Sequence, residues 1–119
     1  MEVKLGDKTY EIRYPFFACR EIEKASGKSV TMFALEMSDK AEAGDISFDS
    51  LAILVWAGIL HMRRNMTLDQ VAVQLDDACE GHNFVDIMAG CAEALLQSIK
   101  SKFPVKEEAE DEKDEEAKN

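Results

Sequence analysis

Leu51-Ala52-Ile53-Leu54-Val55-Trp56-Ala57-Gly58-Ile59-Leu60 is the longest unbroken apolar run in this sequence of 119 residues. It is too short to span a bilayer as a helix, which takes about 20 apolar residues. It is longer than a typical strand and contains alanine and glycine, which strands disfavour. A helix that is apolar on every side must be covered on every side. We therefore expect a central helix over residues 48–62, with the other helices packed against it.

The ends of this central helix carry suitable residues. Ser47 or Asp45 can cap its first turn, and Asp49 places a carboxylate near the positive end of the helix dipole. Gly58 lowers the helix propensity by about 1 kcal/mol relative to alanine. We expect that its use is to let a neighbouring segment of backbone approach closely.

The segments around the apolar run predict a hairpin and four further helices. Alternating residues predict strands over residues 2–5 and 9–13 with a turn between them, and their apolar face must lie on the helices. Apolar residues three and four apart indicate the helices. The residues expected to cap or stop them are Pro15, Gly27, Ser29, the capping box Thr67–Gln70, Gly81, Asn83 and Pro104. The expected inner faces are Phe16, Cys19, Ile22 and Ala25; Val30, Phe33, Ala34, Met37 and Ala41; Leu68, Val71, Ala72, Leu75, Ala78 and Cys79; and Phe84, Ile87, Met88, Cys91, Ala92, Leu95 and Ile99.

Together these elements predict a mainly α fold, an N-terminal β-hairpin followed by a compact bundle of about five helices. We expect the hairpin and helices to form a single domain over residues 1–102. Residues 103–119 hold eight acidic and three basic residues, and Phe103 and Val105 are their only large apolar side chains. Such a segment cannot bury a core, so we expect a disordered acidic tail.

The composition excludes several classes of partner. The formal net charge is −10 at pH 7, so phosphate backbones repel the chain unless it presents a basic patch, and Arg63-Arg64 alone is too small to be one. The N-terminus has no apolar signal segment. The three cysteines show no CxxC spacing, which fits a reducing compartment. We therefore expect a soluble, cytoplasmic protein that binds neither nucleic acid nor a membrane.

No motif for catalysis is found in the sequence. Gly27-Lys28-Ser29 is similar to the end of a P-loop, but Ile22 stands where the upstream glycine is needed. His61 and His82 belong to no metal-binding motif, and no serine lies in GxSxG. We expect no enzyme activity, no cofactor and no bound metal.

One short motif supports a different class of function. Asp49-Ser50-Leu51 matches the Asp-Ser-Leu of acyl carrier proteins, in which the serine carries phosphopantetheine at the start of a helix. In carriers the following helix is acidic and amphipathic, whereas here it is the apolar run. Ser50 is kept as an alternative phosphopantetheine site, and a generic acidic adaptor protein is a third interpretation.

Three stretches resemble the phage tail assembly chaperones, including the related small proteins of gene transfer agents. The first is the strand pair that runs into a short apolar and acidic helix ending at Gly27. The second, Leu54-Val55-Trp56-Ala57-Gly58-Ile59-Leu60-His61, is similar to the Leu-Trp-Ala-Gly-Leu core helix of that family. The third, Met66-Thr67-Leu68-Asp69-Gln70-Val71, is similar to its Leu-Thr-Leu-Glu-Glu-Val helix start. The resemblance covers most of residues 2–100.

The resemblance implies a non-catalytic helper in phage tail assembly. Such chaperones bind the tape measure protein, a long and aggregation-prone helical chain, and keep it soluble while the tail tube protein assembles around it. They act in the host cytoplasm, are absent from the mature virion, and in some cases form rings or dimers. The family often makes a longer frameshifted product. Here Ala117-Lys118-Asn119 can be encoded GCA AAA AAC, which contains a slippery string, so a longer form of this chain is a further expected partner.

The resemblance also directs attention to the methionines as client-binding residues. Methionine side chains give adaptable surfaces that accept varied partners. Met32, Met37, Met62 and Met66 cluster in the middle of the sequence. We expect a helix-in-groove contact with the client on exposed apolar edges near these four residues.

Overall fold

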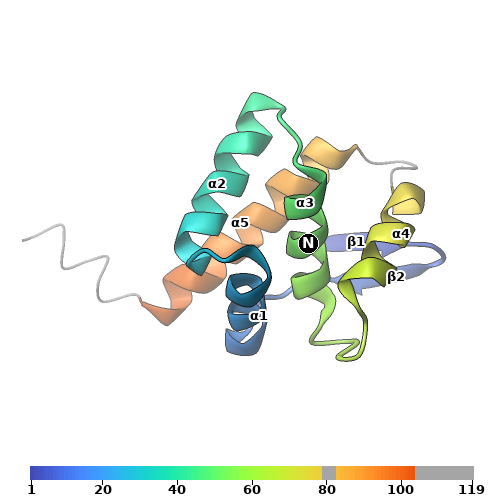
Figure 1. Ribbon diagram of the computed structural model, residues 1–119, viewed down its shortest axis with the longest axis horizontal. Helices are drawn as coiled ribbons and strands as arrows, with labels where there is room; N and C mark the ends of the chain where they lie inside the picture. The colour runs from blue at the N-terminus through green and yellow to red at the C-terminus, as the bar shows by residue number, and fades with distance from the viewer. Residues whose placement is uncertain (79–82, 104–119) are drawn as a thin grey trace, which may run out of the picture.

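The computed structural model describes residues 1–78 and 83–103, with the side chains of residues 77 and 78 left out. Within these ranges the chain forms an antiparallel hairpin followed by five helices, so the expected fold class is confirmed (Figure 1). The elements are β1 (Glu2–Leu5), β2 (Lys8–Glu11), α1 (Phe16–Ser26), α2 (Val30–Ala43), α3 (Phe48–Ile59), α4 (Leu68–Ala78) and α5 (Phe84–Lys102). The disorder expected for residues 103–119 concerns positions that lie outside the described residues, apart from Phe103, and so does the helix end expected at Gly81.

The apolar run forms α3, and α3 lies at the centre of the fold (Figure 1). Every residue from Leu51 to Leu60 is buried except Trp56, which is half-buried. Helices α1, α4 and α5 and strand β2 pack against α3, while α2 packs chiefly on α5. Covering by neighbours on several sides explains how so apolar a helix is accommodated.

Helix α3 ends at Ile59, three residues before the expected end at position 62. The amides of Met62 and Arg63 both donate to the Ile59 carbonyl oxygen at 3.0 Å, which closes the last turn. The Trp56 indole donates to the Met66 carbonyl oxygen at 2.9 Å and holds the returning chain against the helix. The bond from the Trp56 side chain across the loop helps to set the end of α3. The periodicity of apolar residues gives no sign of such a bond.

The hairpin lies against α3 and α4 with its apolar face inward. Its four inward side chains are buried, as expected: Val3, Leu5, Tyr10 and Ile12. Leu5 pairs with Lys8, which leaves a two-residue turn with Gly6 at φ 66°, a conformation that glycine adopts without strain. Strand β2 ends at Glu11, two residues earlier than expected, because the Arg13 amide turns away to donate to the Gly58 carbonyl oxygen at 3.0 Å.

Gly58 is therefore the point of closest approach between α3 and the segment after the hairpin, as its position in the sequence predicts. A Cβ atom on Gly58 would lie 2.8 Å from Ile12 Cγ2 and 3.0 Å from the Tyr14 hydroxyl oxygen. The same hydroxyl donates to the Leu54 carbonyl oxygen at 2.7 Å. Only glycine leaves room here for both the backbone bond and the tyrosine ring.

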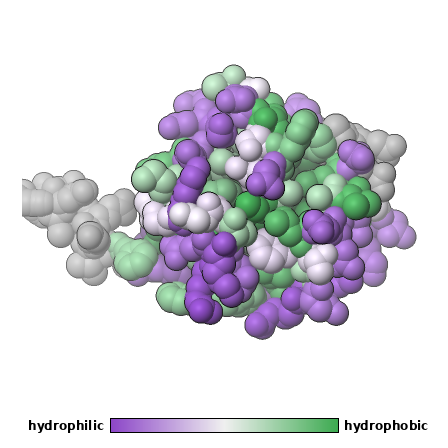
Figure 2. All heavy atoms as spheres, viewed as in Figure 1, coloured by the Kyte–Doolittle hydropathy of each residue, from purple (hydrophilic) through white to green (hydrophobic). Residues whose placement is uncertain are grey.

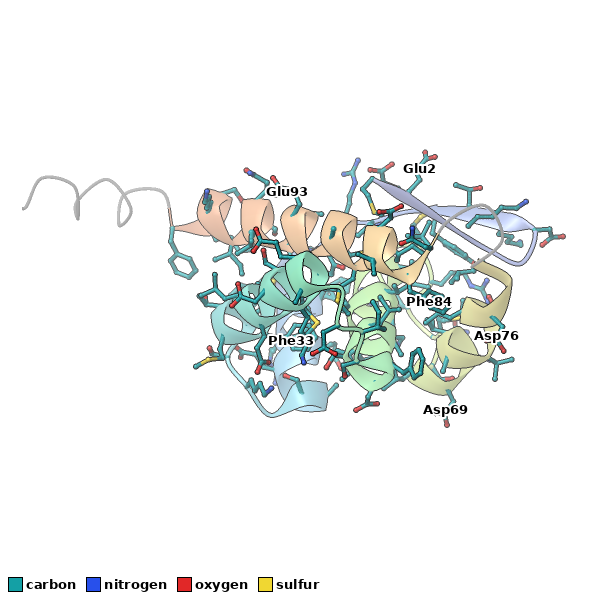
Figure 3. All side chains as sticks on the ribbon, turned by 90° about the horizontal axis from the view of Figure 1, so that it is seen from above. Glu2, Phe33, Asp69, Asp76, Phe84 and Glu93 are labelled. Carbon is teal, nitrogen blue, oxygen red and sulfur yellow. The ribbon has the colours of Figure 1, made fainter. Side chains whose placement is uncertain are left out.

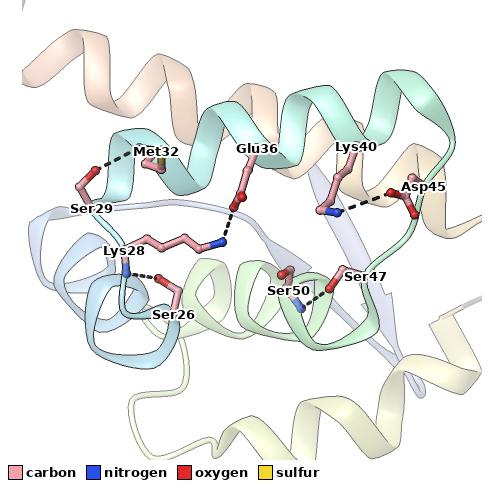
Figure 4. Close-up of polar contacts among 9 residues, drawn as sticks. All are labelled: Ser26, Lys28, Ser29, Met32, Glu36, Lys40, Asp45, Ser47 and Ser50. Atoms are coloured by element: carbon pink, nitrogen blue, oxygen red, sulfur yellow. Dashed lines mark hydrogen bonds and ion pairs between the residues drawn. The ribbon is translucent and has the colours of Figure 1, made fainter.

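The helix caps expected at described residues are present, whereas the stop signals Gly81 and Pro104 lie outside these residues. Ser29 accepts from the Met32 amide, and Ser47, rather than Asp45, caps α3 by accepting from the Ser50 amide (Figure 4). Ion pairs join Lys28 to Glu36 at 2.6 Å and Lys40 to Asp45 at 3.5 Å (Figure 4). The remaining caps are both halves of the Thr67–Gln70 box, the bond from the Asp86 amide to Asn83, and Gly27 at φ 75°. The caps contribute about 1 kcal/mol each and exposed ion pairs less.

Among the side chains that the structure describes, the expected inner faces are correct for most residues and wrong for three; Ala78 and Cys79 are not among these side chains. Phe33 points into the interior beside α3, whereas Asp69 and Glu93 point outward (Figure 3). Phe16, Ala25 and Ala72 were expected to face inward, but all three are exposed. Cys19 and Ile22 are buried as expected, together with Ala18, because α1 lies against both α2 and α3. The contact surface of α1 is therefore rotated away from Phe16.

Candidate functional site: an apolar groove between α1 and α5

One side of α1 forms the first wall of a groove. Phe16, Cys19, Arg20 and Glu23 all line it. Their spacing of three and four residues places them in one stripe along the helix. The stripe lies next to the buried face of α1, and Cys19 belongs to both. The rotation of α1 that exposes Phe16 therefore also creates this wall.

The last turn of α5 and the start of α2 complete the groove. Ile99, Lys102 and Phe103 line it from the C-terminal end of α5, and Val30 lines it from the first residue of α2. In Figure 1 this end of α5 lies beside the first turns of α2, with α1 next to it. The groove has a volume of about 370 Å³. That is near the lower end of the range of about 300–1,000 Å³ for ligand pockets, so it suits a few apolar side chains.

Two phenylalanines stand at the mouth of the groove. Phe16 is 73% exposed and Phe103 is 59% exposed, although both are large apolar residues. Hydrophobic side chains also reach the surface over α3 in the middle of the face shown in Figure 2, with hydrophilic ones around them. Covering apolar surface releases about 25 cal/mol per Å². A partner that covers both phenyl rings therefore gains binding free energy, because these rings are exposed to water in the free chain.

Cations outnumber anions along the rim of the groove. Arg20 is exposed and forms no ion pair with any of the described residues. Lys102 is half-buried. The Glu23 carboxylate accepts a hydrogen bond from the Val30 amide at 2.9 Å, which fixes the turn between α1 and α2. The groove is thus apolar inside with a basic rim, on a chain whose formal charge is −10.

Hydrogen bonds hold the α5 wall in place. Ser98 Oγ donates to the Tyr14 carbonyl oxygen at 2.5 Å, and Lys102 Nζ donates to Ser98 Oγ at 2.6 Å and to the Tyr14 carbonyl oxygen at 3.2 Å. A serine beside a lysine is one arrangement for nucleophilic catalysis. Here the serine proton is already donated to a backbone carbonyl, so these bonds fix α5 to the segment before α1.

Three buried side chains, those of Tyr14, Cys19 and Cys91, have raised pKa values. Burial raises the pKa of Tyr14 well above its ordinary value, and the neighbouring Cys91 raises it further. Burial also raises the pKa of the Cys91 thiol to about 12. The pKa of Cys19 rises for the same reason, although Lys102 opposes the shift. All three groups are therefore neutral at pH 7, and neither thiol is suited to nucleophilic attack.

These raised pKa values predict a loss of stability in alkali. The unfolded chain releases thiol protons above about pH 8.5, while the folded protein holds them, so stability is complete below that pH and falls as pH rises. Each such group lowers the free energy of unfolding by up to about 1.4 kcal/mol per pH unit. Urea melts between about pH 7 and pH 10 measure the slope. Cys91→Ala should flatten it, and an unchanged slope in that variant would contradict the assignment to Cys91.

A second, more open groove lies beside His61. It has a volume of about 570 Å³ and is lined by Ile12, Arg13, Tyr14, Pro15, His61, Ala94, Gln97 and Ser98. His61 Nε2 lies 2.7 Å from the Glu11 carbonyl oxygen, so this nitrogen carries the proton and donates it. No carboxylate is among these lining residues, and a histidine held in this way lacks the acidic partner of a catalytic pair. His82 lies outside the described residues.

The four methionines expected to bind the client differ in exposure. Met32 is 57% exposed and Met62 is 50% exposed, but neither lines the groove between α1 and α5. Met37 is 0% exposed and Met66 is 5% exposed. Both are part of the hydrophobic core. Met37 and Met66 themselves are therefore not on an exposed edge of the folded protein, and a client contact near the four methionines stays a prediction.

Ser50, the alternative phosphopantetheine position, lies in the first turn of α3. Its side chain is half-buried, and its amide donates to the Ser47 side chain at 3.4 Å. Asp49 is exposed in the same turn. Both positions are accounted for by the start of the helix, where an acidic residue suits the helix dipole.

Phe16 and Phe103 are not among the site residues that the sequence predicts. One signal was available, since Phe16-Phe17 places two large apolar residues side by side at a helix start, and both cannot face the same way. Phe17 is half-buried and carries the Arg64 guanidinium 4.2 Å from its ring centre. Phe16 is consequently the ring left in solvent.

The chain was also compared with known proteins. No family model, no curated protein and no solved structure matches it. Across residues 1–78 and 83–103, no helix combines the length and apolar character that a membrane crossing demands. In the same part of the chain, His, Cys, Asp and Glu side chains form no group of three that could hold a metal ion. A proposal for the function of this chain therefore has to start from the geometry of the groove.

Proposed function

We propose that this chain is a non-catalytic binding protein that holds an apolar helical segment of a partner in the groove between α1 and α5. The observation that carries the proposal is the pair of exposed rings, Phe16 and Phe103, at the mouth of an apolar groove. Helix-in-groove recognition uses such a site, with large apolar anchors from an amphipathic helix entering it. Aromatic residues, phenylalanine among them, are also enriched at protein interfaces relative to the rest of the surface.

The partner that we propose is the tape measure protein of a phage tail, and the class is that of the tail assembly chaperones. The identity of the partner comes from the resemblance in sequence. The groove supports it in chemical terms, because a long helical chain exposes many apolar side chains before its assembly and a chaperone must cover some of them. The proposal includes action in the host cytoplasm and absence from the mature virion.

Coexpression with the tape measure protein encoded by the same phage tests this proposal. We expect the wild-type chain to keep the tape measure protein in the soluble fraction and to copurify with it. The double variant Phe16→Asp/Phe103→Asp should lower the recovered complex at least about tenfold, because charged groups replace the two anchors (a loss of about 1.4 kcal/mol or more). Both residues are exposed, so these changes leave the core intact.

Val73→Asp is the matched control. Val73 is exposed on α4 and does not line the groove, so this variant should bind as the wild type does. Loss of binding in both variants to the same degree would show a nonspecific effect of surface charge. Full binding by the double variant would rule out the groove, and no complex with the wild-type chain would rule out the chaperone function.

A further inference from the structure

We infer that residues 104–119 of the same chain dock over the groove between α1 and α5 and compete there with the partner helix. The competition rests on the proposed function, whereas the docking itself does not. The acidic segment would then act as a weak internal occupant that covers the exposed rings until a partner displaces it.

The segment of residues 104–119 starts next to the groove. Phe103 is the last described residue, and its side chain lines the groove. The sixteen residues that follow thus begin at the mouth of the groove. Fully extended they reach at most about 55 Å, which exceeds any path along the α1 wall. A segment tethered so closely has an effective concentration in the millimolar range, so even weak contacts become populated.

The charge of the segment is opposite to that of the groove rim. Residues 104–119 hold eight acidic and three basic residues. Residues 1–103 are also acidic overall, with sixteen acidic and eleven basic residues, so most of the folded surface repels the segment. The groove is different, because its charged lining residues are two cations, Arg20 and Lys102, and one carboxylate, that of Glu23. Charge complementarity therefore directs the segment to this site.

The composition of the segment also defines how it binds. Val105 is its only large apolar side chain, so the contact depends on charge far more than on apolar burial. Charge pairs at a solvent-exposed rim weaken with salt, since the screening length is about 10 Å at 0.1 M. An apolar helix that fills the groove has the opposite dependence. The two occupants can therefore be distinguished by ionic strength.

Paramagnetic broadening in the full-length chain tests the docking. The probe is a nitroxide on Ala109→Cys, in a chain that also carries Cys79→Ser, and the Cys19 and Cys91 thiols are buried. We expect broadening of the Arg20 and Val30 amide signals at about 0.02 M salt and its loss at about 0.5 M.

Arg20→Glu should remove the broadening, whereas Arg13→Glu, at an exposed position that does not line the groove, should not. Broadening that is absent, or that survives both high salt and Arg20→Glu, overturns the inference.

A second measurement separates this inference from the proposed function. The full chain with the eight acidic residues of 104–119 replaced by their amides should bind a tape measure protein fragment about two- to tenfold more tightly than the wild type. Equal binding by the two forms overturns the competition. Failure of both forms to bind the fragment, with the broadening intact, overturns the proposed function and leaves the docking in place.

Discussion

Gly58→Val should lower the free energy of unfolding by about 2–3 kcal/mol, the cost of overpacking a filled core. Any Cβ at this position would meet Ile12 Cγ2 at 2.8 Å, and the Tyr14 hydroxyl oxygen and Cζ at 3.0 and 3.1 Å. Ile12 and Tyr14 are buried, and the Tyr14 hydroxyl is bonded to the Leu54 carbonyl oxygen, so neither side chain can move aside freely. The better helix propensity of valine returns less than about 1 kcal/mol. Thermal and urea melts measure the effect.

Gly90→Ala is the control for Gly58→Val. Gly90 is also a helical glycine, and its Cβ would lie 2.7 Å from another atom, but that atom is the terminal carbon of the Met1 side chain. A flexible chain end that is partly exposed can move, so Gly90→Ala should be neutral or stabilising by up to about 1 kcal/mol. The two glycines thus differ in what surrounds them and not in secondary structure.

A double variant gives a further check on the cause. Ile12→Ala alone should destabilise the protein, because Ile12 is buried. Combined with Gly58→Val it should cost at least about 1 kcal/mol less than the sum of the two single changes, since it removes the atom that a Cβ at residue 58 meets first. Additive effects would show that the contact with Ile12 is not the source of the loss.

The parts of this fold that were predictable from the sequence are those that local chemistry determines. The capping serines, the Thr67–Gln70 box and Gly27 mark helix ends through bonds to residues three or four positions away. The apolar run predicted a covered central helix because no other environment suits it. The use of Gly58 was also predictable in kind, since glycine inside a helix needs a compensating reason.

The groove was not predictable in the same way. Its walls, Phe16 in α1 and Phe103 after α5, are far apart in the sequence, and only the tertiary arrangement brings them together. The rotation of α1 depends on its packing against α2 and α3 together, which its own periodicity cannot report. The positions of the methionines were not predictable either, because methionine is found both in the core and on the surface of proteins.

Met37→Ala and Met32→Ala should therefore have very different effects, although the two residues lie five positions apart in α2. Met37 is wholly buried in the core, so its truncation leaves a cavity and should cost about 2–5 kcal/mol. Met32 is exposed, and its truncation should change the stability by no more than about 0.5 kcal/mol. Urea melts of both variants at pH 7 measure the difference.

Binding to the tape measure protein is the second measurement for the Met37→Ala and Met32→Ala variants. Met37→Ala should bind as the wild type does at temperatures where it remains folded, because the side chain has no access to a partner. A stable Met37→Ala that fails to bind would return this residue to the client-binding surface and would require α2 to turn during binding. Met32→Ala should also bind normally, because Met32 does not line the groove. Binding that depends on Met32 and not on Phe16 would move the site to the outer face of α2.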